Sequence, residues 1–169
     1  FEEFETNRLL QSNMRVPMSK SINLNADMGE GFGAYDIGND YEILKIIRSA
    51  SIACGFHAGD PNVMHRVVLL AKSEGVSIGA HPGFRDLWGF GRQRIDMKPA
   101  DLELQIAYQI GALQAIAAYA NETVTHLKPH GALNNMAADD LDYALAVGKA
   151  IKAVNPDMIY VALAGSEME

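Results

Sequence analysis

The sequence predicts an α/β fold of parallel strands, arranged as a β/α barrel in preference to an open, doubly wound sheet. Five strand-like segments alternate with helical segments, which is the pattern of consecutive βαβ units. The strands carry polar residues on one face, and a polar or ionisable residue follows nearly every strand, as at the mouth of a barrel. No P-loop or GxGxxG pattern follows a strand, so the usual signals of nucleotide-binding folds are missing. The last strand lies close to the final residue, so we expect a C-terminally incomplete barrel of the first five β/α units.

The composition is typical of a soluble globular chain with a sizeable core. Of the 169 residues, 49% are hydrophobic and 21% are charged, and this length suits one domain. The net charge of -7 disfavours nucleic-acid binding, and no apolar run approaches the ~18 residues of a membrane helix. Cys54 is the only cysteine, so no intrachain disulfide can form, which fits a reducing compartment. We therefore expect a cytoplasmic protein with no nucleic-acid or membrane partner.

The N-terminal residues 1–20 do not resemble the rest of the chain, and we interpret them as a tag-like or disordered arm. The predicted barrel domain covers residues 21–169. Its first strand, residues 21–27, alternates in polarity and places Asn25 and Asp27 on one face. A glycine-rich loop that contains Glu30 follows this strand and leads to a short helix.

The segment that most strongly indicates the fold reads SIACGFHAGDP and covers residues 51–61. It consists of an apolar strand, a glycine-rich loop that presents His57, and the start of a helix. Asp60 suits the N-cap of that helix and Pro61 suits its first position. Glu74-Gly75 then provides a C-terminal stop. The remaining predicted elements are a short helix at 41–49, a strand at 76–81, a helix at 101–120, a strand at 123–128, a helix from 139 or 140 to 154, and a strand at 158–164.

Four ionisable residues lie at or just after the carboxyl ends of predicted strands. They are Asp27, His57, His81 and His130, and each of the three histidines lies near a glycine. In a barrel these strand ends converge on one face, so we predict a shared catalytic site. Histidine and aspartate serve as general acids and bases, and they also ligate divalent cations. If a metal is bound, these four residues are its predicted ligands.

Other polar residues are candidates for supporting roles. Lys128 lies two residues before His130, so on an extended segment it faces the same way and would supply positive charge. Arg92, in a glycine-rich loop, could bind a carboxylate or a phosphate, and a solvated position is equally consistent with the pattern. Glu30 is a further acid, whereas Asp60 is better explained as a helix cap. Cys54 lies near His57, but a lone cysteine in a buried strand is more often a small apolar residue than a nucleophile.

Several long motifs resemble those of the LamB/YcsF family, in the family's order: NLNADMGEGFG, SIACGFHAGDP, GAHPGFRDLWGFGR, QIGAL and HLKPHGAL. The resemblance runs from about Ile22 to the end of the chain. It implies a seven-stranded β/α barrel related to those of glycoside hydrolases and polysaccharide deacetylases. It also implies the A subunit of a prokaryotic 5-oxoprolinase, which uses ATP and subunits B and C to cleave 5-oxo-L-proline to L-glutamate. The site residues that it implies are Asp27, Glu30, His57, His81, Lys128 and His130.

The chain departs from the family pattern at Asn134, where the motif GALYN has tyrosine, so a hydroxyl contributed by that tyrosine is missing. The expected substrate-binding residues are Glu30, Arg92 and Asn134. Family members also continue well beyond this chain. Two alternatives stay open at this point. One is a metal-dependent deacetylase or amidohydrolase acting on carbohydrate, and the other is a non-catalytic subunit that delivers 5-oxoproline to its partners. The sequence leaves the oligomeric state undetermined, and a homo-oligomer is compatible with it.

Overall fold

The computed structural model describes residues 22–169, in which parallel strands alternate with helices. The predicted N-terminal arm, residues 1–20, lies outside the described residues. The strands are β1 Asn25–Met28, β2 Ser49–Ala53, β3 Ser77–His81, β4 Val124–Leu127 and β5 Ile159–Tyr160. The helices are α1 Asp40–Leu44, α2 Pro61–Glu74, α3 Pro99–Tyr119, α4 Gly131–Asp139 and α5 Leu141–Val154. None of the helices in the described part of the chain combines the length and hydropathy that a membrane crossing requires.

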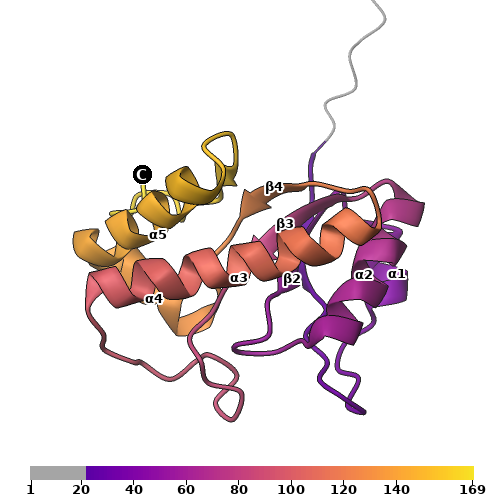
Figure 1. Ribbon diagram of the computed structural model, residues 1–169, viewed down its shortest axis with the longest axis horizontal. Coiled ribbons are helices and arrows are strands. Elements are labelled where there is room, and N and C mark those ends of the chain that lie inside the picture. Colours follow the sequence, from indigo (N-terminus) through magenta and orange to yellow (C-terminus); the bar gives the residue numbers. More distant parts are fainter. Residues whose placement is uncertain (1–21) are drawn as a thin grey trace, which may run out of the picture.

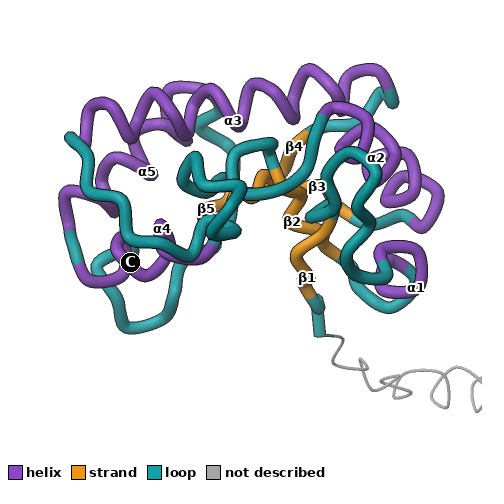
Figure 2. The backbone as a smooth tube through the Cα atoms, turned by 90° about the horizontal axis from the view of Figure 1, so that it is seen from below, coloured by secondary structure: helices purple, strands orange, loops and turns teal. Residues whose placement is uncertain are grey.

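All five strands form one parallel sheet in the order β1-β2-β3-β4-β5. Figure 1 shows the long helix α3 running across the strands, and Figure 2 shows α2, α3 and α5 along one side of the sheet. A doubly wound sheet would reverse its strand order and place helices on both faces. The predicted α/β fold is therefore confirmed, with the consecutive strand order of a β/α barrel.

The hydrophobic core lies between the outer face of the sheet and the helices. Ile52, Ile78 and Leu127 point from neighbouring strands into this layer and are almost completely buried. Val67 of α2 and Ile110 of α3 pack in the same core and have no exposed surface. Burial of each such side chain stabilises the fold by about 1.5–3 kcal/mol relative to an exposed position. This layer fixes the helices on one face and leaves the other face of the strands for polar residues.

The inner face of the sheet is polar. Asp27, Ser51, Gly79 and His126 are register partners across four neighbouring strands, and residues in register on parallel strands share a face. The hydroxyl of Ser51 donates to Oδ1 of Asn25 at 3.0 Å. A Cβ atom on Gly79 would lie 2.2 Å from the His126 ring, so glycine makes room for the imidazole. The polar face predicted for the first strand thus extends over the neighbouring strands of the sheet.

Helix α4 is the main departure from the predicted secondary structure. The sequence pattern predicted a single helix that begins at Asp139 or Asp140, whereas α4 already begins at Gly131. Gly131 has a φ of +53°, and the N-cap residue His130 makes no side-chain capping bond, so neither residue signals a helix start. Packing stabilises α4 instead, since Leu133 and Ala137 have no exposed surface.

Candidate active site

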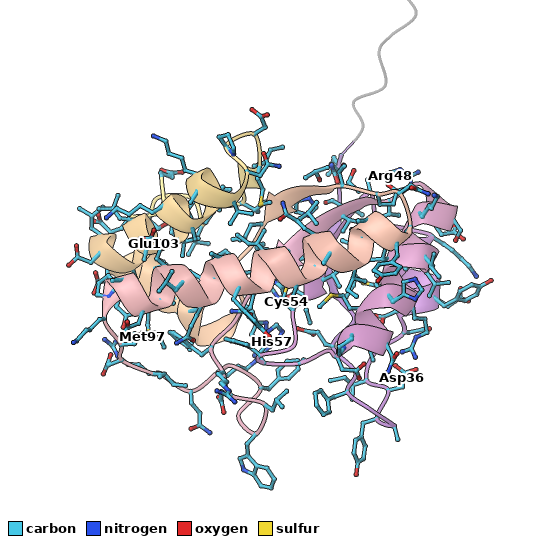
Figure 3. All side chains as sticks on the ribbon, in the orientation of Figure 1. Asp36, Arg48, Cys54, His57, Met97 and Glu103 are labelled. Atoms are coloured by element: carbon cyan, nitrogen blue, oxygen red, sulfur yellow. The ribbon has the colours of Figure 1, made fainter. Side chains whose placement is uncertain are left out.

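The carboxyl ends of four consecutive strands bring the predicted catalytic residues together. Figure 3 shows Arg48 near the start of β2 and His57 beyond its far end, on the side where Asp36 also lies. Because the strands are parallel, the other carboxyl ends reach the same side. The residues that meet there are Asp27 near the end of β1, Glu30 after β1, His57 after β2, His81 at the end of β3, and Lys128 and His130 after β4.

Asp60 holds two of these loops together. Its Oδ1 accepts hydrogen bonds from the backbone N–H groups of Asn62 at 2.8 Å and Val63 at 3.0 Å, as predicted for an N-cap. Its Oδ2 accepts a third bond, at 2.7 Å, from the backbone N–H of Gly33 in the loop that carries Glu30. One carboxylate thus caps the N-terminus of α2 and also stabilises the position of the Glu30 loop beside His57.

Replacing Asp60 with asparagine should loosen the Glu30 loop while α2 stays capped. Asparagine keeps one carbonyl oxygen for the cap, but its NH₂ group cannot accept from Gly33. We expect the amide hydrogen of Gly33 to exchange about tenfold faster, since one hydrogen bond is worth about 0.5–1.5 kcal/mol. The matched control is Asp140→Asn, because Asp140 caps α5 through Asp142 and Tyr143. Equal exchange at Gly33 in both variants would contradict this role of Asp60.

Three imidazole rings and the Glu30 carboxylate form a compact cluster. Oε1 of Glu30 lies 3.1 Å from Nε2 of His57, 3.4 Å from Nδ1 of His130 and 3.9 Å from Nε2 of His81. The rings of His57 and His130 stack, with centroids 3.7 Å apart and planes 4° from parallel. The ring of His81 stands nearly perpendicular to both. All three histidines are at least 97% buried, so solvent screens these interactions weakly.

Asp27 forms a second charged pair beside this cluster. Its Oδ1 accepts a hydrogen bond from the Lys128 ammonium, and its Oδ2 lies 3.3 Å from Nε2 of His81. Burial by itself would raise the pKa of Asp27, but His81 and Lys128 outweigh it and hold the pKa well below its usual range. Asp27 is therefore a carboxylate anion at neutral pH, with its charge balanced by Lys128.

Burial also lowers the pKa of three histidines. The pKa values of His57, His126 and His130 fall below the ordinary value of 6.5 because desolvation penalises the charged ring. For Glu30, burial alone would raise the pKa, but the hydrogen bond from His57 opposes burial and the pKa is lowered. The site therefore favours neutral imidazoles beside ionised carboxylates.

Acidification from about pH 7.5 to about pH 5 should destabilise the fold by roughly 1–3 kcal/mol. Below pH ~6.5 the three histidines bind protons in the unfolded chain before they do so in the folded chain, so stability falls as the pH falls. Asp27 and Glu30 do not oppose this change, because their lowered pKa values keep them ionised in that window.

The urea midpoint at the two pH values, measured with EDTA so that no metal competes with protons, checks this prediction. The His126→Gln variant should show a smaller difference between the two midpoints. An equal or higher midpoint at the lower pH would contradict the prediction.

The donor atoms of the cluster are compatible with a divalent metal. One ligand atom from each of four side chains lies within 4.8 Å of the others, and the four are Glu30, His57, His81 and His130. Imidazole nitrogen and carboxylate oxygen are ligands that Zn²⁺ and other first-row transition metals accept. This group contains Glu30 where the sequence led us to expect Asp27.

Two cavities flank the cluster. The polar one, of about 320 Å³, is lined by Asp27, His81, Lys128, Arg92 and Asn134, together with residues after β5. The structure thus places both remaining predicted substrate-binding residues, Arg92 and Asn134, next to the catalytic candidates.

The second cavity, of about 360 Å³, lies on the side of Glu30 and His57. It is largely apolar, and Tyr35, Leu87 and Trp88 contribute to its walls. The Trp88 side chain is 97% exposed. The cluster therefore borders one polar and one apolar space.

Gln109 supports the site and was missed by the sequence analysis. It lies inside α3 with no exposed surface, accepts from Gly83 N–H at 3.0 Å and donates to Gly83 C=O at 3.0 Å. A Cβ on Gly83 would lie 2.7 Å from Nδ1 of His57, so Gln109 fixes backbone that touches this ring. A polar residue on an otherwise apolar helix face was the available signal.

Burial raises the pKa of Cys54 to about 12, which agrees with a structural rather than nucleophilic cysteine.

Known proteins match most of the described chain. The LamB/YcsF family profile matches residues 22–169. The chain is 55% identical over 150 residues to the 5-oxoprolinase A subunit 2 of Bradyrhizobium diazoefficiens, covering 88% of this chain and 59% of that protein. It is also 55% identical over 150 residues to the 5-oxoprolinase A subunit of Natranaerobius thermophilus, covering 89% of this chain and 58% of that protein.

A crystal structure shares the fold. The lactam utilization protein of Thermus thermophilus superposes with a TM-score of 0.87 at 44% identity, covering 88% of this chain and 60% of that one. The chain therefore spans about three fifths of the length of the relatives that it matches.

Proposed function

Because the chain belongs to the LamB/YcsF family, we propose that it acts as the A subunit of an ATP-dependent 5-oxoprolinase. In this proposal it works with subunits B and C, and the complex opens the lactam ring of 5-oxo-L-proline to give L-glutamate. The names of the relatives, 5-oxoprolinase A subunits and a lactam utilization protein, support this assignment. The structural observation that most strongly supports the assignment is one polar cavity lined by Asp27, His81, Lys128 and Arg92.

The chemistry of 5-oxoproline suits this cavity. The molecule is a small five-membered lactam with one carboxylate, and a guanidinium group binds a carboxylate through two parallel hydrogen bonds. Arg92 would bind the substrate carboxylate, with Asn134 beside it. Lys128 would then face the lactam oxygen, where negative charge develops during attack at the carbonyl carbon. The substrate would lie between these cations and the imidazole cluster.

ATP would overcome the resonance stabilisation of the lactam amide. Transfer of the γ-phosphoryl group to the lactam oxygen, with ATP bound by the assembled complex, makes the carbonyl carbon more electrophilic. Water then attacks this carbon, a cluster imidazole takes its proton, and the ring C–N bond breaks as the nitrogen is protonated. A second water hydrolyses the resulting acyl phosphate to L-glutamate and phosphate. His57, whose Nε2 lies 3.1 Å from Oε1 of Glu30, is the imidazole proposed to take this proton, with His81 and His130 beside it.

Replacing Arg92 with methionine tests the substrate assignment. We expect KM for 5-oxoproline to rise about 10–100-fold with little change in kcat, since a lost charge-assisted hydrogen bond is worth about 1.5–3 kcal/mol. The assay is 5-oxoproline-dependent phosphate release by the chain with subunits B and C. The matched control is Arg94→Met, because Arg94 is exposed and pairs with Asp96 at 3.1 Å.

Three outcomes count against parts of the proposal. Unchanged KM in Arg92→Met would refute the carboxylate site. If variants of the three histidines kept full turnover, the chain would deliver substrate rather than catalyse its hydrolysis. ATP-independent hydrolysis of an N-acetylated sugar would favour a deacetylase instead.

A further inference from the structure

Two backbone carbonyl groups determine which ring nitrogens of His81 and His130 carry a proton. Nδ1 of His81 lies 2.6 Å from the carbonyl oxygen of Lys128, and Nε2 of His130 lies 2.8 Å from that of Phe90. A carbonyl oxygen only accepts hydrogen bonds, so both nitrogens must be N–H donors. In the neutral rings, Nε2 of His81 and Nδ1 of His130 therefore carry lone pairs.

These two lone pairs face each other across 3.0 Å in a buried site. Neither nitrogen can donate to the other, so the contact is repulsive between neutral rings. Oε1 of Glu30 adds a negative charge, 3.4 Å from Nδ1 of His130 and 3.9 Å from Nε2 of His81. Three electron-rich atoms thus converge. This arrangement is favourable only if a positively charged species lies between them.

We propose that this species is a divalent transition-metal ion, bound by His81 Nε2, His130 Nδ1 and Glu30 Oε1. Ligands about 2.0–2.1 Å from a tetrahedral Zn²⁺ lie about 3.3–3.4 Å from one another. The three separations here, 3.0, 3.4 and 3.9 Å, bracket that value. Two imidazoles and one carboxylate are a common donor set for Zn²⁺, Mn²⁺ or Fe²⁺. The carbonyl groups of Lys128 and Phe90 fix the ring orientations, as outer hydrogen-bond partners do in known metal sites.

His57 is excluded from this ligand set although one of its nitrogens lies close by. The lone pair of an imidazole nitrogen lies in the plane of its ring. The rings of His57 and His130 are parallel and stacked at 3.7 Å, so one ion cannot lie in both planes. The rings of His81 and His130 cross at 88° and meet this requirement. His57 instead donates from Nε2 to Glu30, which orients the ligand carboxylate.

The ion would lie at the same barrel mouth as the substrate, so its assignment rests on the proposed function. A bound divalent cation lowers the pKa of water and polarises a carbonyl oxygen. Asp27 stays outside the ligand set because it is not in the group of side chains whose ligand atoms lie within 4.8 Å of one another; its Oδ1 pairs with Lys128 and its Oδ2 adds negative charge 3.3 Å from Nε2 of His81. With His81 and His130 as ligands, His57 is the cluster imidazole that remains to take the proton of the attacking water.

Titration of the purified 169-residue chain with CoCl₂, followed by the visible absorption of bound Co²⁺, tests this site. We expect one Co²⁺ per chain, displaced by ZnCl₂. The His130→Gln variant should lose the band, with affinity reduced at least about 100-fold, and Glu30→Gln should shift the band and weaken binding. His57→Phe, which preserves the stacked ring, should keep the band position, with affinity reduced at most about 10–100-fold as expected for an outer-shell partner. His65→Gln, on the exposed face of α2, is the matched control and should leave binding unchanged.

Circular dichroism establishes that each variant is folded, and Glu30→Gln serves as the ligand test if His130→Gln does not fold. Absence of the Co²⁺ band in the wild-type chain, together with no Zn²⁺ binding by calorimetry, would overturn the inference. Loss of the band in His57→Phe would overturn the assigned ligand set. Metal binding without 5-oxoproline turnover would contradict the proposed function alone. Turnover by the complex that survives removal of transition metals with 1,10-phenanthroline would contradict the metal inference alone.

Discussion

Asp27→Asn should lower kcat/KM for 5-oxoproline about a thousandfold in the assembled complex, within the range for loss of a group that assists proton transfer. Asp27 contributes a negative charge that faces His81 at 3.3 Å and neutralises Lys128. Asparagine has the same shape, so the loss isolates the charge. Without it, the Lys128 ammonium stands unbalanced beside the site and opposes the positive charge that develops as water gives up its proton.

Steady-state phosphate release with subunits B and C measures this effect, and circular dichroism verifies the fold. The matched control is Asp36→Asn, an exposed acid in the loop that follows the same strand, which should keep normal kinetics. Turnover within about tenfold of wild type in Asp27→Asn would remove Asp27 from the proposed mechanism.

Gly91→Ala should reduce the free energy of unfolding by about 2–6 kcal/mol, because left-handed backbone strain and overpacking each cost about 1–3 kcal/mol. Gly91 has a φ of +62°. A Cβ there would lie 2.6 Å from Cβ of His57 and 2.9 Å from Cδ2 of His130, so it would push on the stacked pair. Activity should fall with stability, since the same contact positions both rings.

The matched control is Gly75→Ala at the end of α2. Gly75 has a similar φ of +66°, but a Cβ there would meet nothing within 4 Å, so only the backbone strain remains. Urea unfolding of both variants measures the difference. If Gly91→Ala and Gly75→Ala lost the same stability, the close packing of Gly91 against the histidines would have no energetic consequence.

The parts of the site that follow from strand order could be predicted from the sequence. His57, His81 and His130 each lie at or just after the carboxyl end of a strand, and parallel strands necessarily bring their carboxyl ends to one side. Asp60 was predicted as an N-cap because aspartate before proline is a local signal, and its two bonds to the helix confirm it. Each of these features is signalled by residues that are near one another in the sequence.

The remaining features depend on contacts between distant segments. The stacking of His57 on His130 joins two loops that are far apart in the chain, and no local pattern encodes it. Gln109 meets Gly83 across 26 residues, and the bond between Asp60 and Gly33 spans 27. Helix α4 was not predicted because its stability comes from burial of Leu133 rather than from capping residues.

The position of Trp88 makes the site observable by fluorescence. It is the only tryptophan of the chain, and its indole is exposed to water at the rim of the apolar cavity beside Glu30 and His57. Emission from the native protein should therefore be that of a hydrated indole. Any molecule that enters this cavity, or any protein surface that covers it, would shift the emission to shorter wavelength. Assembly of the complex can thus be followed without a label, at a residue that borders the proposed catalytic groups.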